Sequence, residues 1–164
     1  MNASSIARNR IGVAPITYKA AAATSITADA AVSAYNNATS TAAFKALKAV
    51  TIQDTAANIK AKFSDLKKMG ADGKLTAVKV TGATPIISVQ AADLVNSSAL
   101  LAKLTGATLK VSDTSVNIKS NFASLNTAIK SLSAIEVTDN TRATIKVTAA
   151  EYATNAAVLA KISG

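Results

Sequence analysis

An internal repeat constrains the fold of this chain more than any other feature of its sequence. The stretch DTAANIK at residues 54–60 returns as DTSVNIK at residues 113–119, which is 59 residues later. Between residues 51–66 and residues 110–125, seven of sixteen positions are identical. Two such stretches indicate a duplicated structural unit, because similar sequences at a fixed spacing form the same local structure.

A second block repeats in the same order, since residues 91–106 return as residues 149–164 with an offset of 58. The two blocks together predict two tandem units, repeat 1 over residues 50–106 and repeat 2 over residues 107–164. Each unit is about 60 residues long.

The residues before these units divide into two parts. Residues 20–49 are interpreted as a degenerate half-repeat, because Ile26-Thr27-Ala28 resembles Val147-Thr148-Ala149. Residues 1–19 stand outside the repeat as an N-terminal extension.

Each unit is predicted to run strand, helix, strand, strand, helix, which gives an α+β fold with a sheet covered by helices. The opening strand of repeat 2 shows this well, since Ala107, Leu109 and Val111 alternate with Thr108, Lys110 and Ser112. The helix that follows begins at Asp54-Thr55 and again at Asp113-Thr114, where oxygen atoms can accept the free N–H groups of the first turn.

Apolar residues at helical spacing then predict one buried helix face in each unit: Ile59, Phe63 and Leu66 in repeat 1, and Ile118, Phe122, Leu125 and Ile129 in repeat 2. Asn58 and Asn117 recur beside the two Asp residues. Asn and Asp at a helix start are more simply interpreted as caps than as ligands.

The two later strands of each unit are predicted to pair as hairpins. In repeat 1 the strands are residues 75–81 and 86–89, and in repeat 2 they are residues 134–138 and 143–147. Turn-forming residues separate the members of each pair.

The last helix is predicted to begin with a capping box formed by Thr148 and Glu151. Its expected apolar face contains Tyr152, Val158, Leu159 and Ile162, and Gly164 stands at the expected C-terminal cap.

The composition excludes most common catalytic sites. The chain has no His and no Cys, which rules out a Ser-His-Asp triad, a thiolate nucleophile and a zinc site with nitrogen or sulfur ligands. The nine carboxylates are spread along the sequence, and no two share a short motif. We therefore predict no catalytic, cofactor-binding or metal-binding residues, and we do not expect an enzyme.

The net charge of +9 favours attraction to anionic partners. Lys dominates over Arg and aromatic residues are few, which is atypical of specific nucleic-acid binding. Lysines such as Lys60, Lys119 and Lys130 are most simply a solvated helix face, although they could contact an anionic cell-surface glycan. No stretch is long and apolar enough to span a membrane, and no standard cleaved N-terminal signal is evident.

The patterns VSDTxxNIxxxF at residues 111–122 and VTAAEY at residues 147–152 resemble the repeats of large bacterial surface and secreted proteins. Members of that family often occur with haemolysin-type modules and leave the cell by a one-step, type I route. The resemblance covers about residues 45–164. It implies an extracellular or cell-surface protein with an adhesive or layer-forming role, although no glycine-rich calcium-binding nonapeptide is present.

The repeat also leads to a hypothesis of self-assembly. In repeat 1 the second predicted helix is followed directly by the strand that opens repeat 2. In repeat 2 the matching position falls at residues 161–164, and no corresponding strand follows it in this sequence. The strand-like segment 11–18 could supply the next strand to another subunit, in a head-to-tail filament or surface layer. The donor residues would be Ile11, Val13, Ile16 and Tyr18, and the acceptor end would include Leu159, Ile162 and Gly164.

Two alternatives remain open at this level. Segment 11–18 could fold back on its own chain instead of acting in trans. The protein could also be a monomeric cell-surface adhesion or glycan-binding module.

Overall fold

The structure is a computed structural model that describes residues 25–38, 46–139 and 144–163. The predicted N-terminal extension and its donor residues therefore lie outside the described residues, as does Gly164. The chain is mixed helix and strand with parallel sheets, in agreement with the predicted α+β class. The elements in chain order are α1 (Ala28–Asn36), β1 (Val50–Thr55), α3 (Ala56–Ala61), α4 (Phe63–Ala71), β2 (Leu75–Thr81), β3 (Ile86–Val89), η1 (Ala91–Leu94), α5 (Ser98–Leu101), β4 (Leu104–Thr105), β5 (Thr108–Asp113), α6 (Ser115–Ser120), α7 (Phe122–Ala128), η2 (Ile129–Ser131), β6 (Leu132–Val137), α8 (Ala149–Leu159) and β7 (Ile162–Ser163).

All strand pairs in the described chain are parallel, and they form two sheets. The first has the order β1-β2-β4, and the second has the order β3-β5-β6-β7. Ile26 adds a single parallel bridge to Ile52 at the edge of the first sheet. Paired residues are 22 to 27 positions apart in the sequence. The chain therefore winds as a coil in which every turn lays its strand beside the strand of the turn before.

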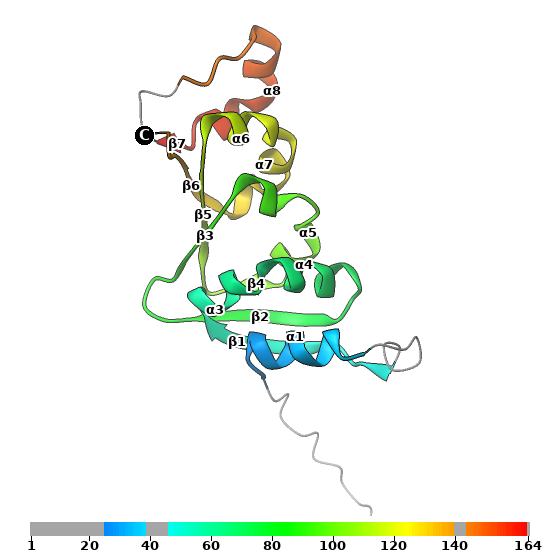
Figure 1. Cartoon of the computed structure of the whole chain (residues 1–164). Helices are drawn as coiled ribbons and strands as arrows, with labels where there is room; N and C mark the ends of the chain where they lie inside the picture. The colour runs from blue at the N-terminus through cyan, green and yellow to red at the C-terminus, as the bar shows by residue number, and fades with distance from the viewer. Residues whose placement is uncertain (1–24, 39–45, 140–143, 164) are drawn as a thin grey trace, which may run out of the picture.

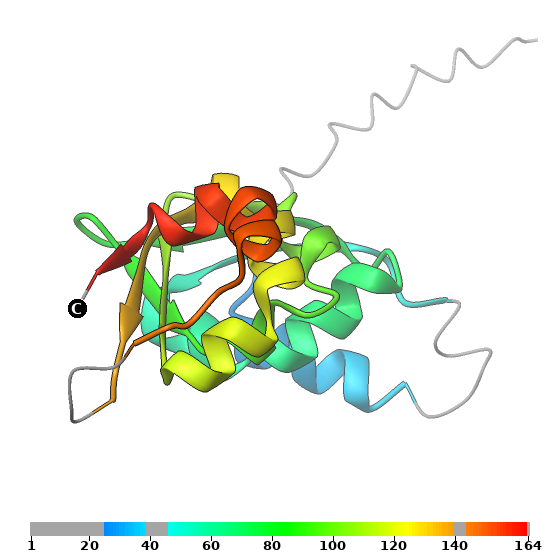
Figure 2. The ribbon, with the colours of Figure 1, turned by 90° about the horizontal axis from the view of Figure 1, so that it is seen from above.

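We define five successive coils by residue number: coil 1 from 25, coil 2 from 50, coil 3 from 75, coil 4 from 104 and coil 5 from 132, with β7 following coil 5. The stack runs from α1 at one end to α8 at the other (Figure 1). Viewed along the stack, the strands β3, β5, β6 and β7 gather on one side and helices α4, α6 and α7 lie on the other (Figure 2).

The predicted hairpins are wrong. Strand β2 pairs with β1 and β4, and β3 pairs with β5, so β2 and β3 do not pair with each other. Residues 144–147 form no strand in the structure, and residue 143 is not described. The turn residues between β2 and β3 instead carry the chain from the first sheet into the second within coil 3.

The alternation predicted for the opening strand of repeat 2 is confirmed, because Leu109 and Val111 are buried in β5 while Thr108 is exposed. The apolar helix positions are also buried, including Phe63 and Phe122, except that Ile129 is only partly buried. The expected single helix is two short helices in each case, since the backbone leaves helical geometry at Lys62 and at Asn121. Ile129 lies in η2, outside α7.

The last helix was predicted partly correctly. Thr148 and Glu151 form the capping box, and Val158 is fully buried. Tyr152 is 61% exposed, contrary to the prediction of an apolar face that includes it. Ile162 belongs to strand β7, not to the helix.

Candidate functional site

Asp54, at the end of β1, accepts three hydrogen bonds through its carboxylate. Its Oδ1 accepts hydrogen bonds from the Thr55 amide at 2.8 Å and from the Asn58 side chain at 2.7 Å. Its Oδ2 accepts the amide of Ala28 at 2.9 Å. Thr55 in turn caps α3 through its hydroxyl, which accepts the Asn58 amide. Because Ala28 lies in coil 1, the carboxylate joins two neighbouring coils.

Asp113, at the end of β5, makes the matching set of bonds. It accepts the Thr114 amide at 2.8 Å, the Asn117 side chain at 2.7 Å and the Ala91 amide at 3.0 Å. Ala91 belongs to coil 3, so this carboxylate also ties its coil to the one before. Asp113 is 5% exposed, and the three hydrogen bonds that it accepts satisfy its buried carboxylate without a ligand.

The predicted first-turn polar contacts of these Asp and Asn residues are confirmed, whereas the N-caps of α3 and α6 are Thr55 and Thr114. The bond to the preceding coil was missed. Asp139 makes a third such bond, since its Oδ2 accepts the Ser115 amide of coil 4 at 2.7 Å. These carboxylates therefore hold the stack together and are engaged in structural contacts.

The two strand-end carboxylates predict acid sensitivity. Burial raises the pKa of Asp54 and Asp113, but the hydrogen bonds from the Asn side chain and the two amides outweigh burial and hold each pKa below its usual value of 3.8. A lowered pKa in the folded state gives stability that is present above pH 3.8 and is lost as the pH falls through the lowered value. We expect the free energy of unfolding, measured by urea titration, to fall steeply below about pH 4. The Asp113→Asn variant should lose less stability than the native chain on the same acidification, and an equal loss would contradict this assignment.

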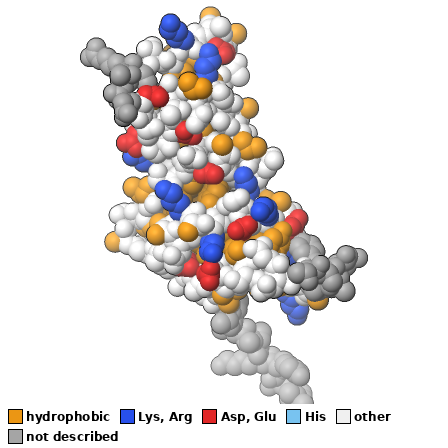
Figure 3. Space-filling view, viewed as in Figure 1, with side chains coloured by type: hydrophobic (Ala, Val, Ile, Leu, Met, Phe, Trp, Pro, Cys, Tyr) orange, Lys and Arg blue, Asp and Glu red, His pale blue; other side chains and the backbone are white. Residues whose placement is uncertain are grey.

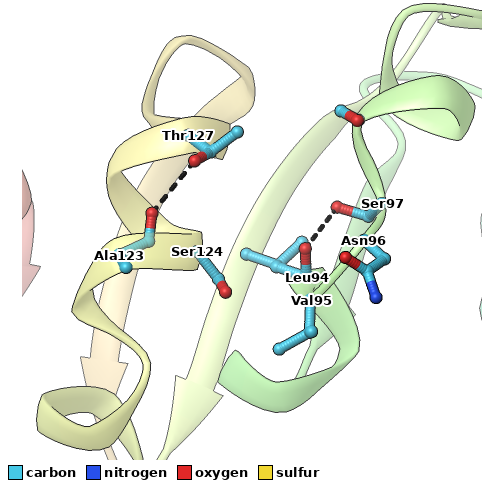
Figure 4. Close-up of a pocket in the computed structure, with 8 residues that line it drawn as sticks. Leu94, Val95, Asn96, Ser97, Ala123, Ser124 and Thr127 are labelled. Carbon is cyan, nitrogen blue, oxygen red and sulfur yellow. Dashed lines mark hydrogen bonds between the residues drawn. The ribbon is translucent and has the colours of Figure 1, made fainter.

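A cavity of about 230 Å³ lies between α7 and the loop after η1 (Figure 4). The Ser97 hydroxyl donates to the Leu94 carbonyl at 2.7 Å, and the Thr127 hydroxyl donates to the Ala123 carbonyl at 3.0 Å. None of the lining residues is charged: Leu94, Val95, Asn96, Ser97, Ser98, Ala123, Ser124 and Thr127. With two hydroxyls already engaged by the backbone, this cavity offers no set of converging reactive groups.

A more polar cleft of about 380 Å³ lies at the carboxyl ends of β3 and β5, and is lined by Lys60, Ser88, Val89, Gln90, Asp93 and Ser112. Asp93 accepts the Gln90 amide at 2.9 Å, and the Ser112 hydroxyl donates to Glu136 at 3.1 Å. Lys60 is exposed, and its ammonium group makes no hydrogen bond or ion pair with any described residue. The cleft can therefore hold a small polar ligand, but it lacks the paired groups of a catalytic site.

Charges are mixed on the face seen in Figure 3, where Lys side chains lie among Asp and Glu side chains and form no patch of one sign. Several lysines are engaged, as in the ion pairs of Lys62 with Asp29 at 2.7 Å and Lys110 with Glu136 at 2.8 Å. Within residues 25–38, 46–139 and 144–163, no three His, Cys, Asp or Glu side chains gather as a metal site would require. In the same residues, no helix has the length and apolarity needed to cross a bilayer.

The predicted acceptor residues lie at the α8 end of the stack. Leu159 and Ile162 are half-buried and pack against the core. Strand β7 pairs with only two of the six residues of β6, Ile135 and Glu136. Among the described residues, the outer edge of β7 and the rest of that edge of β6 have no paired strand.

Comparisons with protein-family models, with characterised proteins and with solved structures find no match to this chain. The resemblance to bacterial surface and secreted repeats therefore stays a prediction.

Proposed function

We propose that this chain is an extracellular structural protein that assembles head-to-tail into a filament or surface layer. Residues 50–106 and 107–164 would be two copies of one unit, and assembly would continue the same stacking between molecules. The observation that carries the proposal is the edge of β6 and β7 that no other described strand pairs with, in a stack built by parallel strand addition.

The internal construction supports this function. Each coil contributes a strand to its neighbour and, at three positions, a carboxylate that bonds to the coil before. A contact that repeats the relation between neighbouring coils is heterologous, and it leads to an open array unless its rotation closes a ring. Open strand edges are sites where a further chain adds by main-chain hydrogen bonds.

The donor would be the segment with Ile11, Val13, Ile16 and Tyr18, acting on the end formed by Leu159, Ile162 and Gly164. The donor residues and Gly164 lie outside the described residues, so the support from the structure comes from the acceptor end alone.

We expect the native chain to form particles whose mass rises with protein concentration, as measured by light scattering after size exclusion and seen by electron microscopy. Replacing Val13 and Ile16 together by Asp should reduce assembly strongly, because charged side chains cannot pack into an apolar acceptor. The matched control replaces Asn9 and Thr17 by Asp, which adds the same charge at polar positions and should leave assembly unchanged. A native chain that stays monomeric at all concentrations would contradict the proposal.

A monomeric chain would instead favour the second candidate, a cell-surface adhesion or glycan-binding module. The polar cleft beside Lys60 is the observation that supports it, since its hydroxyl, amide and ammonium groups are suited to a hydroxyl-rich or anionic sugar.

A further inference from the structure

Three segments of the chain enter a helix in the same way. Each has an apolar residue, an N-cap and then a small residue: Ile26-Thr27-Ala28, Val89-Gln90-Ala91 and Val147-Thr148-Ala149. The N-caps Gln90 and Thr148 both form capping boxes with the acidic residue three positions later. The three segments begin α1, η1 and α8.

The first two segments are covered by the coil that follows them. Ile26 is bridged to β1, α1 packs against α3 and α4, and Ala28 is fully buried with its amide bonded to Asp54. In the same way β3 pairs with β5, and η1 packs against α6 and α7. Ala91 is fully buried, with its amide bonded to Asp113. The covering unit is in both cases a strand followed by two short helices.

Among the described residues, no strand followed by two helices covers the third segment. Its polar contacts are with the preceding coil, since Lys119 donates to the Lys146 carbonyl and forms an ion pair with Glu151 at 3.5 Å. We call Ile145, Val147, Ala149 and Tyr152 the C-terminal face. Ile145 and Val147 are half-buried, Ala149 is exposed and Tyr152 is 61% exposed. Under the proposed duplication these positions correspond to Ile87, Val89, Ala91 and Leu94, which are at most 3% exposed. The C-terminal face is therefore an apolar surface without such a cover, whereas its counterpart inside the chain is covered by a strand and two helices.

We propose that the C-terminal face of one molecule binds the β1–α3–α4 surface of a second copy, in the place that α1 of that copy occupies. The β1–α3–α4 surface is the counterpart of the β5–α6–α7 unit that covers η1. In the exchanged complex, Asp54 would accept the amide of Ala149 from the other molecule instead of its own Ala28. Helix α1 would then act as a displaceable cap. This inference rests on the proposed self-assembly, and it identifies the two surfaces that meet.

The buried residues of α1 are small, namely Ala28, Ala31 and Val32. Ile26 and Tyr35 also pack against the core, but they are only partly buried. The ion pair of α1, Asp29 with Lys62, lies at the surface, where such pairs contribute little. The C-terminal face has Tyr152, which is 61% exposed, where α1 has Ala31, and the larger side chain offers more apolar area to bury.

Helix α1 has the advantage of belonging to the same chain as its binding surface. A short tether gives an effective concentration on the order of 1 mM. Exchange should therefore increase with protein concentration and with any change that loosens α1.

Sedimentation velocity over a range of concentrations tests this with three variants of the full chain. Tyr35→Phe with Asp29→Ala removes the hydroxyl bonded to Asp72 at 2.5 Å and one partner of the Lys62 ion pair. We expect it to raise the association constant about tenfold. Tyr152→Lys should lower the association constant about tenfold, because it removes apolar area from the C-terminal face and adds a charge. Ile86→Lys is the matched control, since Ile86 is 55% exposed and belongs to neither surface.

Hydrogen exchange on the assembled chain supplies a second readout. The amides of α1 should lose protection on assembly, and the first turn of α8 should gain it. The inference would be overturned if α1 stays protected in the assembly. It would also be overturned if Tyr152→Lys and the Tyr35→Phe, Asp29→Ala variant both associate like the native chain.

The outcomes also separate this inference from the proposed function. If the Val13 and Ile16 substitutions abolish assembly while Tyr152→Lys and the α1 variant have no effect, the donor segment assembles the protein and the exchange of α1 is wrong. If the native chain is monomeric but the α1 variant assembles, the proposed function fails for the native chain and the exchange stands.

Discussion

The Asp113→Asn variant is expected to lose about 3 kcal/mol of the free energy of unfolding, which corresponds to a fall in Tm of roughly 10 °C for a chain of this size. The native carboxylate accepts three hydrogen bonds from Ala91, Thr114 and Asn117. An Asn side chain has one acceptor oxygen and one NH2 group, which is a donor. The NH2 group would face a backbone or side-chain N–H and could not accept its hydrogen bond. A buried N–H group without an acceptor lowers the free energy of unfolding by more than an exposed hydrogen bond raises it.

The control for this variant is Asp65→Asn, which removes a surface ion pair with Lys68 at 3.2 Å. Surface pairs contribute little, so the change in stability should stay within about 0.5 kcal/mol. Urea denaturation followed by circular dichroism measures both variants. If Asp113→Asn were no more destabilising than the control, the bond between coils 3 and 4 would not be a main support of the stack.

Local features of the fold were predictable because they depend on neighbouring residues. Thr55, Thr114 and Thr148 were expected to begin helices, and the hydroxyl of each accepts an amide of the first turn. The buried positions of β5 followed from strict alternation of apolar and polar side chains. In each case the signal and its structural cause lie within a few residues of each other.

Strand pairing was not predictable in this way. Gly82 is followed closely by Pro85, and turn residues between two apolar runs are typical of hairpins. In the structure Leu75 pairs with Val50 and Ile86 pairs with Thr108, so the partners are separated by helices. A turn-rich link looks the same in the sequence whether the chain reverses or continues into a second sheet. Only the packing of whole coils decides between the two.

The candidate site shows the same division. Asp54 and Asn58 were interpreted as first-turn contacts, and their mutual bond at 2.7 Å agrees. The bond from Ala28 to Asp54 joins residues 26 positions apart, and an alanine amide leaves no signal in the sequence. The exposure of Tyr152 was not predictable for the same reason. The helix face to which it was assigned is apolar in the sequence whether or not a neighbouring coil covers it.

The Gly106→Ala variant is expected to lose about 3 kcal/mol or more of the free energy of unfolding, through two separate causes. Gly106 has a φ of +78°, which costs an L-residue about 1 kcal/mol. A Cβ at this position would also lie 2.6 Å from the Val80 carbonyl oxygen, which is backbone and cannot move aside on its own. Gly73→Ala is the matched control, because Gly73 has a φ of +68° but no atom beyond its own chain neighbours within 4 Å of the added Cβ. It should lose only the cost of the backbone conformation.

The difference between the two glycine variants therefore measures the close approach at Gly106 alone, which lies where the chain passes from the first sheet to the second. Two hydrogen bonds flank this passage, from the Val78 amide to Lys103 and from the Thr108 amide to Pro85. If the added Cβ pushes β4 away from β2, these two amides should exchange with solvent faster in Gly106→Ala and at the native rate in Gly73→Ala. Equal losses of stability in both variants would mean that the sheets adjust to the extra carbon. The close approach to Val80 would then not exclude a side chain, and glycine would be favoured at position 106 only because of its positive φ.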